Sequence, residues 1–131
     1  MGRLIMLDIK QIIKDSAHVK TAMLDACAPD IQKGAQVMID AIKASGKILW
    51  CGNGGSAADA QHMAAELMGG LVSHDRPAIA SIALTTDSSF VTAWANDTGY
   101  ESIFSRQIEG LGESGDVLIA ISTSGNSQNV I

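Results

Sequence analysis

The chain has 131 residues, of which 47% are apolar, 18% charged and 4% aromatic. This length and composition predict one globular domain with a buried core rather than a disordered chain. The net charge of -5 does not indicate a positively charged surface, so neither nucleic acid nor an anionic membrane is expected as a partner. No apolar run approaches the roughly 18 residues of a membrane-spanning helix.

Two further features indicate the cellular location. Cys27 and Cys51 are the two cysteines, which is typical of free thiols in a reducing compartment, although two small buried apolar residues are the simpler interpretation. The N-terminal stretch MGRLIMLDIK has too short an apolar part, and charges too early, for a signal peptide. We therefore expect a cytoplasmic protein.

Two helices are predicted at the N-terminus. Apolar residues recur at three- and four-residue steps from about residue 7 to residue 26. Pro29 and Asp30 suit the first turn of a second helix, which Gly46 ends. We expect residues 1–46 to form an antiparallel helical hairpin. Its apolar stripes predict either an oligomer interface or packing within the monomer, and both interpretations stay open.

The remaining residues alternate between strands and helices. Apolar runs at 48–51, 79–84 and 117–121 predict three strands. Helices are expected after the glycine-rich turn at 52–56, from the N-cap at 85–88 to residue 95, and from 101 to about 109, with turns at 96–99 and 110–115. This alternation indicates an α/β fold with a doubly wound parallel sheet, whose ligands bind outside the carboxyl ends of the strands.

The sequence stops after what looks like the first turn of a further helix, at 127–131. A doubly wound sheet commonly has about five or six strands, so three are few. We therefore expect residues 1–131 to be one domain that is incomplete at its C-terminus, with the hairpin at 1–46 and the first strands and helices of the sheet at 47–131. Further functional groups are expected beyond Ile131.

The first glycine loop admits two readings. A strand, a glycine turn and a helix N-terminus together build an anion site from backbone N–H groups. Gly52-x-Gly54-x-x-Ala57 also fits a loose dinucleotide fingerprint, but Asp87 lies about 33 residues after Gly54, whereas the ribose-binding acid usually lies about 20 on. The second loop argues against a dinucleotide.

That second loop concentrates hydroxyl groups. Its four hydroxyl residues are Ser122, Thr123, Ser124 and Ser127. Hydroxyls and N–H groups that converge at a helix start can surround one terminal phosphate. Simple N-capping is the plainer reading, but it needs only one of the four, so we predict phosphate binding.

His62 and Glu66 are four residues apart on the helix after the glycine loop, and therefore share one face. A solvated polar face is the common reason for such a pair. Near a bound sugar, however, the carboxylate could move a proton between adjacent carbons. The pair could also share a divalent metal, although two ligands are too few for a closed site.

Other polar residues give weaker signals. Asn96-Asp97 is explained equally well by the turn at a helix end and by binding of a sugar hydroxyl. His18 and His74 have no partners in sequence, and we expect both to be structural.

The segments CGNGGSAADAQHMAAEL and NDTGYESIFSRQIEGLGESGDVLIAISTSGNSQNVI together closely resemble the phosphoheptose isomerases of the sugar isomerase (SIS) family. The resemblance runs from about residue 7 to the last residue. Either loop alone would indicate only a phosphosugar-binding domain, whereas both loops with His62, Glu66 and Asn96-Asp97 are highly specific. The resemblance implies conversion of sedoheptulose 7-phosphate to D-glycero-D-manno-heptose 7-phosphate, the first step toward heptose for the lipopolysaccharide core or related glycans.

The resemblance also implies roles for individual residues. The hydroxyl residues of the second loop would hold the phosphate. The residues that would contact the sugar or shape its pocket are Asn53, Gly54, Gly55, Ser56, Asn96 and Asp97. Glu66 matches the catalytic base, which would move a proton between C1 and C2 through an enediol. With His62 it also matches two ligands of a zinc ion that would hold or polarise the sugar oxygens.

The family pattern extends beyond this sequence. Its remaining zinc ligands, a glutamine and a histidine that is also the second acid/base, belong to a C-terminal helix that these 131 residues lack. The resemblance therefore implies that the 131 residues alone are inactive or severely impaired. It also implies a homotetramer whose subunits contribute to each other's sites, in agreement with the apolar N-terminal helices.

Two alternatives without catalysis are considered. A relative in the same fold family binds the bacterial replication initiator protein, and shares the glycine loop and the histidine but lacks the carboxylate that matches Glu66. The presence of Glu66 therefore favours the enzyme. A regulatory phosphosugar sensor is disfavoured by the acidic charge and by the lack of a basic helix-turn-helix segment.

Overall fold

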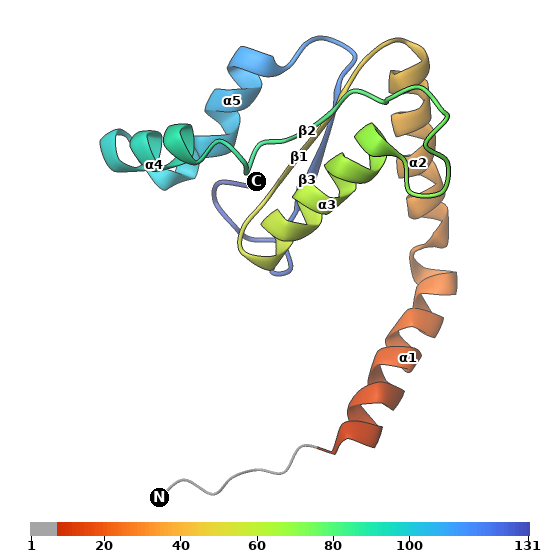
Figure 1. Ribbon diagram of the computed structural model, residues 1–131. Coiled ribbons are helices and arrows are strands. Elements are labelled where there is room, and N and C mark those ends of the chain that lie inside the picture. The colour runs from red at the N-terminus through yellow and green to blue at the C-terminus, as the bar shows by residue number, and fades with distance from the viewer. Residues whose placement is uncertain (1–7) are drawn as a thin grey trace, which may run out of the picture. The chain divides into compact units, whose positions relative to one another are not determined.

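The computed structural model describes residues 8–131 (Figure 1). The elements in chain order are α1 (Ile9–Ala26), α2 (Ala28–Lys43), β1 (Ile48–Gly52), α3 (Gly55–Gly69), β2 (Ser81–Ala83), α4 (Ser88–Asp97), the 3₁₀ turn η1 (Tyr100–Ser102), α5 (Ile103–Leu111) and β3 (Val117–Ile121). Residue 7, the predicted start of the first helix, lies outside the described residues, as does most of the N-terminal stretch examined for a signal peptide. Two compact units, Met1–Gln36 and Val37–Ile131, divide the chain.

The first unit contains α1 and the beginning of α2. Asp8 caps α1 by accepting a hydrogen bond from the Gln11 amide at 3.2 Å. Cys27 alone separates the helices, and helical bonding continues through it: its amide donates to Met23 O and its carbonyl accepts from Ile31 N, both at 2.9 Å. The predicted helix pair is therefore present, but its antiparallel arrangement is wrong. One linking residue cannot form the short loop that reverses the chain, so the two helices follow end to end (Figure 1).

Among residues 8–36 of this unit, nothing covers the apolar stripe of α1. The helix contains no buried residue. Its exposed large apolar side chains are Ile9, Ile12, Ile13, Val19, Met23 and Leu24. A helix with such a stripe is normally stabilised by packing against another surface.

The second unit is built on a three-stranded parallel sheet, in the order β2-β1-β3. Register pairs Trp50 with Ala83 and Gly52 with Ile121. β1 and β3 therefore end together and β2 ends opposite Trp50. Because all three strands are parallel, the segments after them leave from the same edge. This confirms the predicted α/β class and places both special loops at the carboxyl edge of the sheet.

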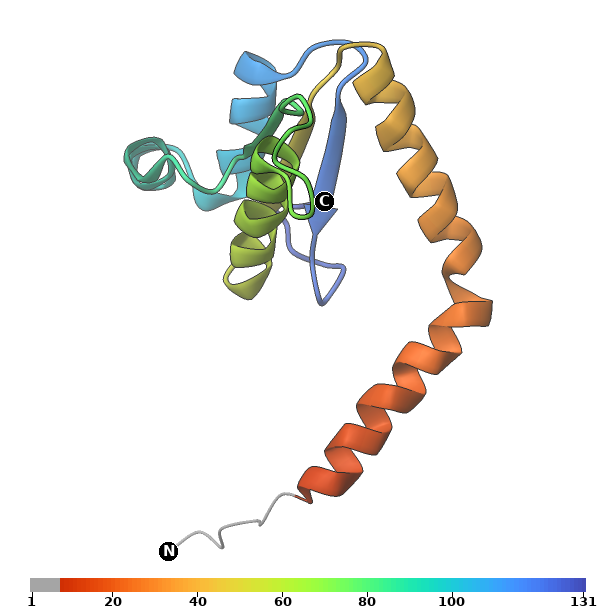
Figure 2. The same ribbon diagram turned by 45° about the vertical axis from the view of Figure 1, so that its right-hand side comes forward.

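The central strand β1 is buried on both faces. Ile48 and Trp50 pack with residues of α2 and α3, whereas Leu49 and Cys51 pack with residues of α4 and α5. Figures 1 and 2 show the helices of the second unit divided in this way between the two faces. Burial on both faces explains why β1 is a continuous apolar run rather than an alternating one.

Several element boundaries differ from the predictions. α4 runs to Asp97 instead of ending at residue 95, so Asn96 and Asp97 are helical. The ladder of β2 covers Ser81–Ala83, fewer residues than the apolar run at 79–84, because only these residues pair with β1. Gly110 lies inside α5 rather than in the following turn, which begins with Gly112. No helix among residues 8–131 is both long enough and apolar enough to cross a membrane.

An ion pair joins two strand starts at the amino edge of the sheet. Lys47 Nζ lies 2.6 Å from Asp116 Oδ2, and Asp116 Oδ1 accepts from the Lys47 amide at 2.8 Å. The Glu113 amide donates to the same carboxylate at 2.8 Å. The hydrogen bond from the Lys47 side chain, aided by those backbone amides, lowers the pKa of Asp116 to about 2. The pKa of Lys47 is raised by the same contact.

We expect Asp116→Asn to destabilise the fold near neutral pH, with a difference from wild type that disappears on acidification. Because the folded-state pKa of Asp116 lies below the ordinary value of 3.8, its stabilisation is complete above that value and is lost as the pH falls toward 2. Urea denaturation between pH 2 and pH 7 measures this difference. Asp75→Asn, at an exposed carboxylate, is the control, and an Asp116→Asn effect independent of pH would contradict the prediction.

Candidate functional site

The end of β1 is the most constrained part of the site. A Cβ on Gly52 would lie 2.9 Å from the carbonyl oxygens of Ile121 and Ser56, so the chain passes closely between β3 and the start of α3. Two residues later Gly54 has φ +57, a left-handed conformation that a glycine adopts without strain. These two glycines bring α3 directly onto the carboxyl edge of the sheet.

We expect Gly52→Ala to lower the free energy of unfolding by roughly 1–3 kcal/mol, because the added methyl group meets backbone oxygens that cannot move aside cheaply. Gly55→Ala is the matched control from the same loop, since no atom lies within 4 Å of its added Cβ. Urea denaturation of both variants provides the comparison. Equal effects of the two substitutions would show that the close approach at Gly52 does not limit the fold.

The glycine loop already uses several of its amides. The Ser56 amide donates to Asn53 O at 3.0 Å, and the Ala57 and Ala58 amides donate to Gly54 O at 3.1 and 3.2 Å. Few of the amides that normally bind an anion at a helix start therefore remain for a ligand. This loop is better suited to shaping a pocket wall than to holding a phosphate alone.

The second loop brings three of its four hydroxyls together. Ser122 Oγ lies 3.3 Å from Ser124 Oγ and 3.1 Å from Ser127 Oγ. The loop backbone is held by the Gly125 amide, which donates to Ser122 O at 3.2 Å. Thr123 is exposed beside them. Three hydroxyls this close can all donate to the oxygens of one tetrahedral anion.

His62 and Glu66 form a pair on α3, as their spacing predicts. His62 Nε2 lies 3.3 Å from Glu66 Oε1, and the His62 side chain is 69% exposed, against 28% for Glu66. The carboxylate is thus partly shielded, while the imidazole is open to ligands. Both groups are oriented by a helix that starts at the carboxyl edge of the sheet.

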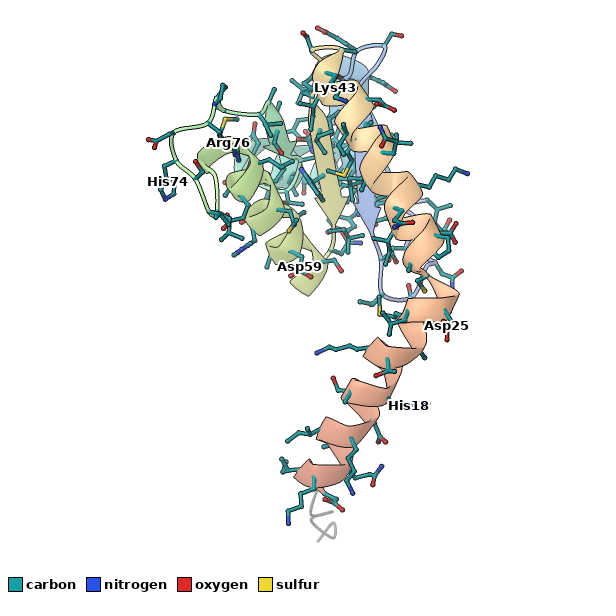
Figure 3. The ribbon with its side chains drawn as sticks, turned by 90° about the vertical axis from the view of Figure 1, so that its right-hand side faces the viewer. His18, Asp25, Lys43, Asp59, His74 and Arg76 are labelled. Carbon is teal, nitrogen blue, oxygen red and sulfur yellow. The ribbon has the colours of Figure 1, made fainter. Side chains whose placement is uncertain are left out.

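Arg76, which sequence patterns did not single out, stabilises the other end of α3. Its Nη2 donates to the carbonyl oxygens of Glu66 and Leu67, both at 2.7 Å. His74 Nδ1 lies 3.2 Å from the carbonyl oxygen of Gly69, the last residue of α3. Figure 3 shows His74 and Arg76 in the loop that follows this helix. A cation at the carbonyl oxygens of the last helical turns complements the helix dipole. Arg76 therefore fixes the turn of helix from which the Glu66 side chain projects, and His74 has the structural position expected of it.

The donor set suits two positions of a zinc site. An imidazole nitrogen and a carboxylate oxygen are common zinc ligands, and 3.3 Å between them is compatible with binding one ion. Within residues 8–131 no group of three or more candidate ligands occurs. The His62–Glu66 pair thus fits two positions of such a site, which would need further ligands from outside this pair.

Asn53 connects the two loops. Its Nδ2 donates to Asn129 Oδ1 at 2.7 Å, and Asn129 Nδ2 donates back to Asn53 Oδ1 at 2.9 Å. The Tyr100 hydroxyl donates to the same Asn53 oxygen at 2.9 Å. Tyr100 and Asn129 lie within the segment that carries the family resemblance, but sequence patterns single out neither residue. No local pattern relates them to Asn53, which lies 47 and 76 residues away.

A small cavity of about 90 Å³ lies beside Asn53 at this edge. Its lining includes Gly54, Thr85 and Tyr100. A water molecule occupies roughly 30 Å³ of liquid, so the cavity has room for a few waters or for part of a ligand. A whole sugar phosphate would extend beyond it along the open loops.

Asn96 and Asp97 are not part of the hydrogen-bond network around Asn53. Both are exposed in the last turn of α4, and Asn96 Nδ2 donates to Asp97 Oδ1 at 2.8 Å. The contacts of the described residues do not join them to either loop. His18 is exposed on α1.

Comparison with known proteins agrees with this arrangement. A sequence model of the SIS domain family matches residues 11–131. The chain is similar to the phosphoheptose isomerase of Thiobacillus denitrificans, with 53% identity over 116 residues, 88% of this chain and 58% of that protein. The structure is similar to a phosphoheptose isomerase from Neisseria gonorrhoeae, with a TM-score of 0.85 and 44% identity over 93% of this chain and 62% of that chain. It is also similar to a phosphoheptose isomerase from Francisella tularensis, with a TM-score of 0.89 and 36% identity over 93% of this chain and 63% of that chain. The chain thus spans about three fifths of the length of these relatives.

Proposed function

The chain belongs to the SIS domain family and is homologous to the phosphoheptose isomerases, and we propose that its protein converts a ketose phosphate into an aldose phosphate. The proposed reaction turns sedoheptulose 7-phosphate into D-glycero-D-manno-heptose 7-phosphate, for glycans such as the lipopolysaccharide core. The observation that most supports it is the His62–Glu66 pair on α3, the helix that begins beside the clustered hydroxyls after β3.

The phosphate is assigned to the second loop. The hydroxyls of Ser122, Ser124 and Ser127 converge, and Thr123 adds a fourth donor. The sugar is assigned to the first loop, where Asn53 and Gly54 line the cavity and Gly55 and Ser56 begin the helix. Asn96 and Asp97 keep the sugar-binding role that the family resemblance implies. Their exposed position is compatible with that role.

Glu66 is the proposed base. Its carboxylate takes a proton from C1 of the open-chain ketose, and the electron pair of that C–H bond forms the C1=C2 double bond of an enediol. The oxygen on C2 gains a proton, and the oxygen on C1 loses one. Glu66 then returns its proton to C2, which yields the aldose. The partial burial of Glu66 limits the water that competes for the carboxylate.

His62 and Glu66 are also the proposed zinc ligands within this chain. Bound there, one divalent ion per site would polarise the sugar oxygens and stabilise negative charge on them. The ligands that complete the coordination are expected outside residues 8–131, so we propose that these residues alone have little or no isomerase activity.

A homotetramer in the cytoplasm is the proposed setting. The uncovered apolar side chains of α1 support burial of this helix against other copies of the chain. Cys27 and Cys51 are free thiols, which agrees with a reducing compartment.

We expect Ser122→Ala to weaken binding of sedoheptulose 7-phosphate and of inorganic phosphate to a similar extent, by roughly tenfold or more, because a hydrogen bond to a charged group is lost. Titration calorimetry measures both affinities. Ser105→Ala removes an exposed hydroxyl on α5 and is expected to change neither. Unchanged phosphate binding in Ser122→Ala would contradict the assignment of the second loop.

We expect Glu66→Gln in the full-length protein to lower kcat by roughly 10²- to 10⁴-fold, the usual contribution of a general base, while the sugar phosphate still binds. Isomerisation of sedoheptulose 7-phosphate is followed with and without a metal chelator. Asp59→Asn, at an exposed residue of the same helix, is the matched control.

Two results would redirect the proposal. Full activity in Glu66→Gln would exclude the proton-transfer role. A wild-type protein that binds the sugar phosphate but never turns it over would instead be a non-catalytic SIS module, such as one that binds a replication initiator.

A further inference from the structure

The Asn53 side chain has an unusually complete set of partners for a group at a ligand site. Its Oδ1 accepts from the Tyr100 hydroxyl and from Asn129 Nδ2, both at 2.9 Å. An amide oxygen has two lone pairs, so both are in use. Its Nδ2 has two hydrogens, and one is donated to Asn129 Oδ1 at 2.7 Å.

One N–H of Asn53 is therefore left over. Within residues 8–131 no contact accounts for this second hydrogen, whereas the oxygen has no remaining capacity. Asn53 is partly buried and lines the cavity at the carboxyl edge, where a ligand would come. Held in this way, the amide can donate to a ligand oxygen but cannot accept from a ligand hydroxyl.

The three residues come from different parts of the chain. Asn53 follows β1, Tyr100 begins η1, and Asn129 lies in the turn after the serine loop. The Tyr100 hydroxyl adds a third hydrogen bond to the amide by donating to Asn53 Oδ1 at 2.9 Å. Together with the two bonds to Asn129, it holds the amide in the orientation that leaves one N–H free at the cavity.

We propose that Tyr100 and Asn129 are positioning residues, which hold the Asn53 amide with its free N–H toward the sugar and connect the amide to the loop that binds the phosphate. This inference rests on the proposed function, since it concerns the sugar end of the same site. The group recognised is an acceptor oxygen of the sugar near the reacting carbons. The phosphate itself depends on the serine hydroxyls and not on this network.

Tyr100→Phe tests the proposal, because it removes one hydroxyl and keeps the ring that lines the cavity. In the full-length protein we expect roughly 2- to 10-fold weaker binding of sedoheptulose 7-phosphate, the scale of one hydrogen bond. Binding of inorganic phosphate is expected to stay within about 2-fold. Asn129→Ala is expected to act in the same direction. Equal weakening for both ligands, or for neither, would overturn the positioning role.

A double-mutant cycle separates positioning from general stabilisation. In an Asn53→Ala background, Tyr100→Phe is expected to have no further effect on sugar-phosphate affinity, because the hydroxyl acts only through the Asn53 amide. A further loss of similar size in that background would overturn the proposal. Thermal denaturation of each variant shows whether folding changes at the same time.

Side-chain amide NMR gives a test that needs no ligand. In the wild type the two Asn53 Nδ2 hydrogens should differ: the hydrogen donated to Asn129 should exchange slowly with solvent and the free one rapidly. Tyr100→Phe should reduce this difference. If the wild-type protein does not bind the sugar phosphate, the proposed function fails, but the exchange rates still show whether Tyr100 and Asn129 hold the Asn53 amide. Rapid exchange of both Asn53 Nδ2 hydrogens in the wild type would overturn the positioning role.

Discussion

The arrangement of the site depends on the close approach at Gly52. This residue ends the central strand opposite Ile121, and the carbonyl oxygens of Ile121 and Ser56 leave no room for a side chain. Because the chain passes so tightly between β3 and α3, the glycine loop and the serine loop begin side by side. The hydroxyl cluster, the cavity and the first turn of α3 then occupy one edge of the sheet without any long-range charge to hold them there.

Stability and ligand chemistry are divided between the two edges of the sheet. At the amino edge, Lys47 and Asp116 form a short ion pair supported by backbone amides. At the carboxyl edge, the contacts are among neutral groups: serine hydroxyls, two asparagine amides and a tyrosine. The hydrogens of the serine hydroxyls can rotate toward a ligand at little cost while their oxygens stay in place, whereas an ion pair there would have to be broken. This division lets the loops exchange their internal hydrogen bonds for ligand contacts while the strands stay paired.

Local patterns in the sequence account for the sheet and for much of the site. The apolar runs at 48–51 and 117–121 became β1 and β3 because burial on both faces demands apolar side chains throughout. His62 and Glu66 meet because helix geometry alone brings positions four apart together. The antiparallel hairpin was predicted wrongly because local patterns indicate helices but not the direction of the chain between them. Pro29 does suit a first helical turn, but a first turn can follow the preceding helix directly, and residue types alone do not show whether the chain reverses there.

The network around Asn53 was beyond sequence reasoning because its partners meet only through the fold. Tyr100 follows a helix end and Asn129 follows the serine loop, so each has an ordinary local explanation. Similarly, the sequence shows Arg76 only as a loop residue. In the fold this loop lies against the end of α3, where the Arg76 side chain donates to the Glu66 carbonyl oxygen.

The two loops contain neither lysine nor arginine between residues 52 and 57 or between 122 and 131, in a chain of net charge -5. Within these loops an anionic ligand must therefore be bound by directed hydrogen bonds rather than by opposite charge. Such bonds depend on geometry far more than charge attraction does. A site of this kind needs its donor atoms placed in advance, and the paired amides and the converging hydroxyls place them at the carboxyl edge of the sheet.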